Sequence, residues 1–131
     1  MKKIFLYFIL PIITLVLEIL PYGVVCNFAY KNIDGTIGIR KSLYSYFDLF
    51  PWGYARFSPF ITAILTCIFF LLLIIFFISR NNGVLLAAKT VLCICVLFSL
   101  FSLVFGFSIV GGLISVSLIL EFILLLLKLK Q

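Results

Sequence analysis

Long apolar runs separated by short polar stretches organise the 131-residue chain. These runs predict helices over residues 4–22, 58–80, 84–105 and 110–128. The last two helices come from one apolar stretch, 84–127, which as a single helix would extend about 66 Å, roughly twice the thickness of a bilayer core. The stretch must therefore fold back, and Phe105–Gly112, which holds three glycines, marks the expected turn.

The segment between the first two predicted helices, 23–57, begins with alternating apolar and polar positions. Asp34-Gly35 is a strong signal for a two-residue hairpin turn, with Ile33 opposite Thr36. This register gathers apolar residues on one face, namely Val24, Cys26, Phe28, Tyr30, Ile37, Ile39 and Leu43. We expect the hairpin to lie with that face down over the helix ends.

An aromatic stretch, SYFDLFPWGYARFSPF (45–60), follows the hairpin and leads into the second predicted helix. Its rings, including Tyr46, suit the headgroup level of a membrane, where amphipathic aromatic side chains are enriched. Direct binding of a partner is the alternative. The candidate partner-binding residues are Phe50, Trp52, Tyr54 and Arg56.

The composition identifies the class of protein. Hydrophobic residues make up 66% of the chain and charged residues 11%, with a mean hydropathy of +1.39, whereas a soluble domain is about half apolar and a quarter charged. We therefore expect one integral membrane domain over 1–131. Its expected fold class is an all-α membrane protein, an up-down bundle of four transmembrane helices with a short β-hairpin in the first outer loop.

The net charge of +6 is spread over the ends of the apolar runs and forms no patch typical of nucleic-acid binding. Placing both termini in the cytoplasm puts six basic residues there and four in the long outer loop. This bias predicts a multi-pass protein of a cell membrane with cytoplasmic N- and C-termini.

The sequence carries no pattern typical of an enzyme. Histidine is absent, and Cys93 and Cys95 are separated by one residue, so a helix would point them to different sides. We expect no metal site and no cofactor, and we expect the cysteines to pack as small residues. No nucleophile stands beside a general base in a recognisable motif. The sequence therefore favours a non-enzymatic protein.

Polar residues inside the predicted helices form the second candidate site. Tyr7, Thr14 and Glu18 recur on one stripe of the first helix, and an ionisable group within a span is a functional-site hypothesis by default. Glu18 either stabilises the loop on the bundle or serves as a proton- or cation-coupled site. The predicted depths of Glu18 and Glu121 in the membrane differ by about 12 Å, so we expect the two carboxylates not to form a pair. We expect Glu121 instead to form an ion pair with Lys89 or Lys128.

Two phrases, LPYGVVCNFAY (20–30) and YSYFDLFPWGYARFSPFITAILTC (44–67), resemble a group of uncharacterised small four-span bacterial membrane proteins. The resemblance covers only residues 20–67. It implies four spans, a structured first outer loop and a bacterial source. It implies no activity and no functional residues.

Two functions are consistent with these observations. The first is a structural or accessory protein that binds another membrane protein, itself or lipid through its outer loop. The alternative is the protomer of a small proton- or cation-coupled transporter that uses Glu18. The expected surroundings are the lipid bilayer, with no nucleic-acid partner.

Overall fold

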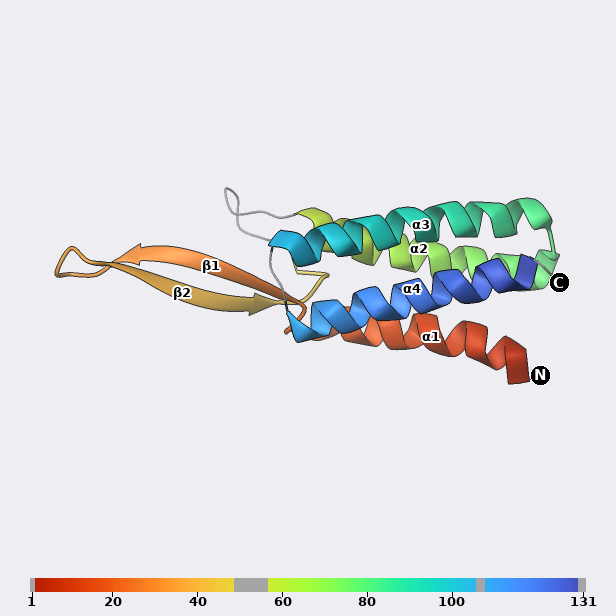
Figure 1. Cartoon of the computed structure of the whole chain (residues 1–131), viewed down its shortest axis with the longest axis horizontal. Coiled ribbons are helices and arrows are strands. Elements are labelled where there is room, and N and C mark those ends of the chain that lie inside the picture. The colour runs from red at the N-terminus through yellow and green to blue at the C-terminus, as the bar shows by residue number, and fades with distance from the viewer. Residues whose placement is uncertain (1, 49–56, 106–107, 130–131) are drawn as a thin grey trace.

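The structure, a computed structural model, describes residues 2–48, 57–105 and 108–129. Its elements are α1 (Lys2–Ile19), β1 (Val24–Lys31), β2 (Ile37–Tyr44), α2 (Phe57–Ser79), α3 (Asn82–Phe105) and α4 (Ile109–Leu129). The helices run side by side, and an antiparallel hairpin projects from one end of the bundle (Figure 1). The start of α1 and the end of α4 lie at the opposite end (Figure 1). The prediction of a helical protein with four helices and one hairpin is confirmed.

Within the described residues, α2, α3 and α4 are long and apolar enough to cross a membrane. The apolar part of α1, Ile4–Ile19, is shorter. The helix ends at Ile19 rather than near residue 22, because the chain turns there to enter β1, whose first residue, Val24, is buried. The other three helices begin and end within two residues of the predicted positions.

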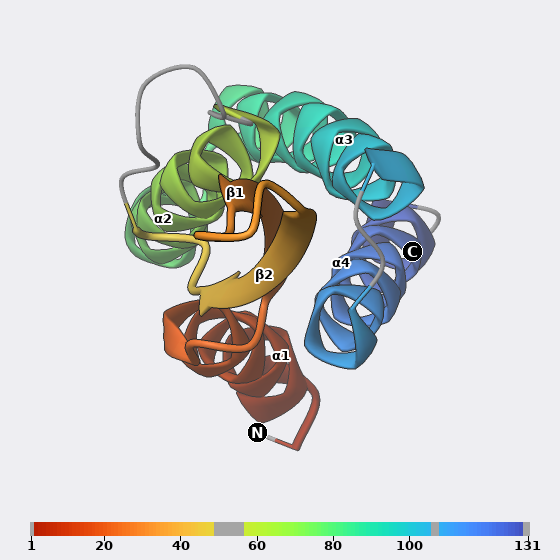
Figure 2. The same ribbon diagram turned by 90° about the vertical axis from the view of Figure 1, so that its left-hand side faces the viewer.

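The four helices form a ring when viewed from the hairpin end (Figure 2). The inside holds small and hydroxyl-bearing side chains such as Ala63 and Thr62, together with larger apolar ones such as Phe69. Large apolar side chains such as Ile78 and Val104 face outward and are four-fifths exposed. This arrangement is typical of helices packed in lipid, where small residues allow close approach and apolar solvent surrounds the outside.

The hairpin register differs by one residue from the prediction. Asn32 N donates to Thr36 O, and Gly35 N donates to Asn32 O, so the turn has three central residues, 33–35. Gly35 has a φ of 80°, which closes this turn type. Thr36 therefore lies opposite Asn32 rather than Ile33. A one-residue change moves all side chains of one strand to the other face relative to its neighbour.

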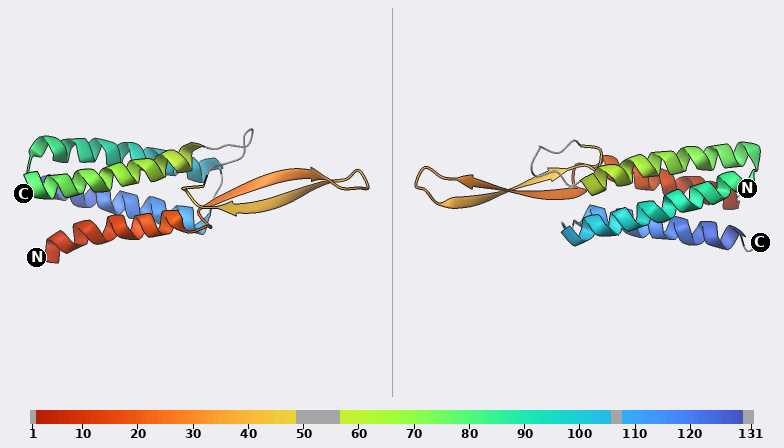
Figure 3. Two further views of the ribbon diagram at one scale, coloured as in Figure 1. Left: turned by 180° about the vertical axis from the view of Figure 1, so that it is seen from behind. Right: turned by 90° about the horizontal axis from the view of Figure 1, so that it is seen from above.

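This register explains why the hairpin does not lie flat on the helix ends. Phe28 is paired with Arg40 and Ala29 with Ile39, so the apolar residues predicted to share one face, such as Phe28 and Ile39, lie on opposite faces. Each face therefore carries both apolar and polar side chains. The expectation of an apolar face lying down is therefore wrong: the hairpin extends along the bundle axis (Figures 1 and 3).

Only the base of the hairpin is packed. Val24 and Cys26 belong to the buried core of the molecule. Farther out, the ring of Tyr30 covers Gly38 on the neighbouring strand, and a Cβ on Gly38 would lie 2.6 Å from that ring. An aromatic ring over a strand glycine stabilises a sheet that has few other contacts.

The turn geometry predicts how substitutions of Gly35 should affect the hairpin. Gly35→Ala should destabilise the hairpin by about 1 kcal/mol, because the left-handed conformation disfavours a Cβ, and open space around Gly35 excludes a steric cause. Gly35→Asn, which tolerates this conformation, is the control. Amide hydrogen exchange of residues 28–40 should accelerate in the alanine variant and change little in the asparagine variant. Equal exchange in both variants would contradict the left-handed conformation of Gly35.

Candidate functional site

The centre of the bundle holds a carboxyl group from α4 bound to a hydroxyl group from α1. Thr14 Oγ1 lies 2.6 Å from Glu121 Oε1 and 2.6 Å from Ser117 Oγ. It also lies 3.0 Å from the carbonyl oxygen of Leu10, one turn earlier in its own helix. Thr14 has no exposed surface and Glu121 is 3% exposed. These contacts connect α1 to α4.

A second carboxyl group makes the same kind of contact between α1 and α2. Glu18 Oε1 lies 2.8 Å from Thr66 Oγ1, and Thr66 Oγ1 also lies 2.8 Å from the carbonyl oxygen of Thr62, one turn earlier. Cys95 Sγ of α3 lies 3.4 Å from the same hydroxyl. Glu18 and Thr66 are fully buried. Each glutamate therefore meets a threonine that also contacts a carbonyl of its own helix.

Two further pairs of hydroxyl groups complete the connections between neighbouring helices. Ser99 of α3 shares a hydrogen bond with Ser115 of α4. Nearer the hairpin end, Ser58 of α2 contacts Ser102 of α3 at 2.7 Å. Every neighbouring pair of helices in the ring is thus joined by polar side chains. We call the central group the polar core: Thr14, Glu18, Thr66, Cys95, Ser99, Ser115, Ser117 and Glu121.

The polar core contains two acids and no described base that neutralises them. Glu121 binds Thr14 rather than a lysine, so the expected ion pair with Lys89 is not formed, and the side chain of Lys128 lies outside the described residues. Lys89 is buried in α3, yet it forms no ion pair with either glutamate. The second oxygen of each carboxyl group, Oε2, is buried with no hydrogen-bond partner among the described residues.

The two carboxyl groups are bound separately. They share no hydrogen bond, since Glu18 contacts Thr66 and Glu121 contacts Thr14. In the described part of the chain, no group of three or more metal-ligating side chains comes together.

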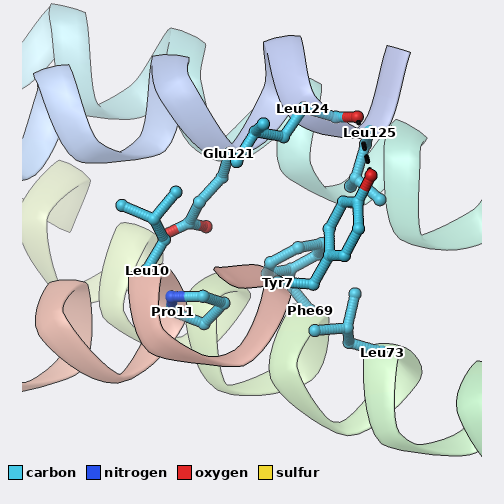
Figure 4. Close-up of a pocket in the computed structure, with 8 residues that line it drawn as sticks. All are labelled: Tyr7, Leu10, Pro11, Phe69, Leu73, Glu121, Leu124 and Leu125. Atoms are coloured by element: carbon cyan, nitrogen blue, oxygen red, sulfur yellow. Dashed lines mark hydrogen bonds between the residues drawn. The ribbon is translucent and has the colours of Figure 1, made fainter. Parts of the chain in front are cut away.

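A small cavity adjoins Glu121 on the side of the bundle that holds the termini. Its volume is about 10 Å³, which is room for roughly one water molecule. Tyr7, Pro11 and Leu124 line it, and the Glu121 side chain reaches across it from α4 toward α1 (Figure 4). Tyr7 Oη donates to the carbonyl oxygen of Leu124 at 3.5 Å. Tyr7 thus borders the Glu121 cavity without contacting Glu18.

Tyr46 closes the bundle at the hairpin end. Its backbone N–H donates to the carbonyl oxygen of Glu18 at 3.0 Å, and its side chain is 1% exposed. The ring lies so close to Gly23 that a Cβ there would approach it to 2.7 Å. Burial, together with the neighbouring charge of Glu18, raises the pKa of the Tyr46 phenol, so the group remains neutral. The Tyr46 ring therefore packs inside the hairpin end of the bundle, and its depth in a membrane stays a prediction.

Ser108 holds the base of the hairpin against α4. Its hydroxyl donates to the carbonyl oxygen of Gly23 at 2.6 Å. Gly111 lies beside this bond, and a Cβ there would come within 3.3 Å of Tyr46 Oη. Tyr46, Ser108 and the two glycines thus connect the hairpin directly to the end of the polar core.

The structure brings together some of the candidate residues and separates others. Thr14, Glu18 and Glu121 are part of the polar core, and Tyr7 lies beside the cavity. The loop candidates Phe50, Trp52, Tyr54 and Arg56 lie outside the described residues.

The sequence analysis included Thr14 but missed Thr66, which binds Glu18, and Ser117, which contacts Thr14. A signal was present on α2, where Ser58, Thr62 and Thr66 recur every four residues and so share one face. On α4, Ser117 and Glu121 have the same spacing. No comparable local pattern distinguishes Tyr46 from the other aromatic residues of its segment.

Comparisons with known proteins provide no relative. No family model, no curated protein and no solved structure matches the chain.

The threonine contacts generate a test of the polar core. Thr14→Val preserves the shape of the side chain but leaves Glu121 Oε1 without its hydroxyl partner, which should destabilise the bundle by about 1 kcal/mol or more. Thr14→Ser should retain most of the stability. The matched control is Thr90→Val, because the exposed Thr90 hydroxyl binds only the carbonyl of Ala87 in its own helix. Thermal unfolding in detergent would measure the three variants, and an equal loss in Thr14→Val and Thr90→Val would contradict the proposed contact.

Proposed function

We propose that this chain is a non-enzymatic membrane protein whose hairpin binds a segment of another protein outside the membrane. One observation carries the proposal: the hairpin extends along the bundle axis, and most of its outer half is exposed (Figures 1 and 3). Strands of eight residues each reach about 26 Å at 3.3 Å per residue. Such a reach exceeds what is needed to connect two helices.

The exposed side chains support a binding role. Ile33 at the turn is fully exposed, and Ile37 is 77% exposed. A two-stranded hairpin alone is marginally stable in water, and exposed apolar residues add to that cost. A bound partner that covers these residues would stabilise the arm.

The chemistry of the arm indicates the kind of partner. In the described part of the chain each strand has a single neighbour, so both strands are edges that can accept an added strand. Lys31, Arg40 and Lys41 outnumber the one acid of the hairpin, Asp34. The proposed partner is therefore an extended protein segment with acidic residues. The lipid surface is a poorer match, because the arm extends away from the helix ends.

The proposal includes four spans, with the hairpin outside a bacterial cell membrane and both termini in the cytoplasm. The start of α1 and the end of α4 lie together at the end of the bundle opposite the hairpin, which supports this arrangement (Figure 1). The lysine and arginine bias of the sequence supports the same orientation.

Site-specific photo-crosslinking in native membranes tests the proposal. A photoreactive amino acid at Ile37 or Ile33 should yield a discrete adduct with one other protein. The matched control position is Val104, which is equally exposed but belongs to a helix that faces lipid; this position should give no such adduct. The proposal is wrong if both hairpin positions yield only lipid adducts, only a second copy of the chain, or no adduct.

Charge reversal tests the partner chemistry. Replacing Arg40 and Lys41 by glutamate should lower the crosslinking yield from Ile33 on the order of tenfold, because like charges would then face an acidic segment. Asp34→Lys should leave the yield unchanged or raise it. A yield unaffected by the reversal would contradict an acidic partner.

A further inference from the structure

The hydrogen-bonding capacity of Thr14 limits the state of Glu121. A hydroxyl group has one hydrogen to donate and two lone pairs to accept. The carbonyl oxygen of Leu10, 3.0 Å from Thr14 Oγ1, can only accept the threonine hydrogen. Glu121 Oε1, at 2.6 Å, lies within reach of the same hydrogen, so an ionised Glu121 and the Leu10 carbonyl would compete for it. The competition ends if Glu121 and Ser117 Oγ, also at 2.6 Å, both donate to Thr14. Glu121 can donate only as a protonated acid.

The same count applies to Thr66 and Glu18. The carbonyl oxygen of Thr62, 2.8 Å from Thr66 Oγ1, takes the hydrogen of this hydroxyl. Glu18 Oε1 at 2.8 Å and Cys95 Sγ at 3.4 Å then face its lone pairs. A thiol can donate a weak hydrogen bond, and a protonated Glu18 can donate a strong one. The two sites thus satisfy all partners of each threonine when both acids carry a proton.

The surroundings support the same state. Each Oε2 atom is buried with no partner among the described residues, which is tolerable for a neutral carbonyl oxygen and costly for an ionised carboxylate. Among the described residues, the titratable groups around the two acids are Tyr46 from the segment after β2, Cys67 of α2, Cys95 of α3 and Tyr7 of α1. Tyrosine and cysteine side chains cannot carry a positive charge, and Lys89 makes no ion pair with either acid.

We propose that Glu18 and Glu121 form a reversible proton-binding site in the polar core, with both acids protonated at neutral pH. Its ligand is the proton. The Glu121 half is reached through the cavity beside Tyr7, from the end of the bundle that holds the termini, and Tyr46 closes the hairpin end. This site is independent of partner binding by the hairpin.

Infrared spectroscopy of the protein in lipid bilayers tests the site directly. The chain has only four acidic side chains, Glu18, Asp34, Asp48 and Glu121. Of these, Glu18 and Glu121 are buried, whereas Asp34 and Asp48 are exposed to water. At neutral pH the wild-type protein should therefore show two carbonyl bands of protonated carboxylic acids. Glu18→Gln and Glu121→Gln should each remove one band, and the exposed-loop control, Asp34→Asn, should remove none.

The order of hydrogen exchange tests the access route. When the bilayers are transferred to heavy water, the band removed by Glu121→Gln should shift first, because the water-sized cavity adjoins that acid. The Glu18 band should shift later. If the Glu18 band shifts first or at the same time, access through the cavity is wrong.

Other outcomes would overturn the proton site itself. Carboxylate bands only, at neutral pH and in the absence of sodium and potassium ions, would show that the acids are ionised. Loss of the acid bands when sodium or potassium is added at constant pH would assign the site to a metal cation instead. If a glutamine variant fails to fold, labelling of the wild-type protein with dicyclohexylcarbodiimide remains decisive, because this reagent requires a protonated acid. Labelling should occur at Glu18 or Glu121 and decline as the pH rises, and an unlabelled protein would contradict the proposal.

Discussion

The burial of two carboxyl groups within a bundle of apolar helices is the constraint on which the rest of the structure depends. A polar group buried without a hydrogen bond costs a few kcal/mol, and a buried charge costs more, so each acid must find a hydrogen-bonding group whether or not it is ionised. Thr14 and Thr66 supply those groups from neighbouring helices. Because each contact crosses a helix–helix interface, the need to satisfy the acids also fixes which helix faces point inward and how deeply the helices lie relative to one another.

Hydrogen bonds connect the base of the hairpin directly to the helices that form the polar core. Tyr46 donates from its backbone to Glu18 and places its ring inside the hairpin end of the bundle. Ser108 connects α4 to the last residue before β1. The base of the arm is thus anchored by the same residues that close the core, while its outer part extends freely.

Much of the architecture could be predicted from the sequence, because long apolar runs and the Asp34-Gly35 turn are local signals. The hairpin register could not, since two-residue and three-residue turns both suit that dipeptide and differ by one residue in pairing. The binding partners of Glu18 and Glu121 also depend on how α1, α2 and α4 rotate about their axes. That rotation is determined by contacts between residues far apart in the chain, such as Thr14 and Glu121, which are 107 positions apart. No local sequence pattern records such contacts.

Solid-state NMR would test the central claim most directly. The protein contains two glutamates and five threonines, so selective ¹³C labelling of both residue types in lipid bilayers resolves every possible pair. The structure predicts two contacts between glutamate carboxyl carbons and threonine side chains, one from Glu18 to Thr66 and one from Glu121 to Thr14. Assignment by Thr14→Ser and Thr66→Ser would identify each. Carboxyl carbons that contact water or lipid in place of threonine would contradict the account.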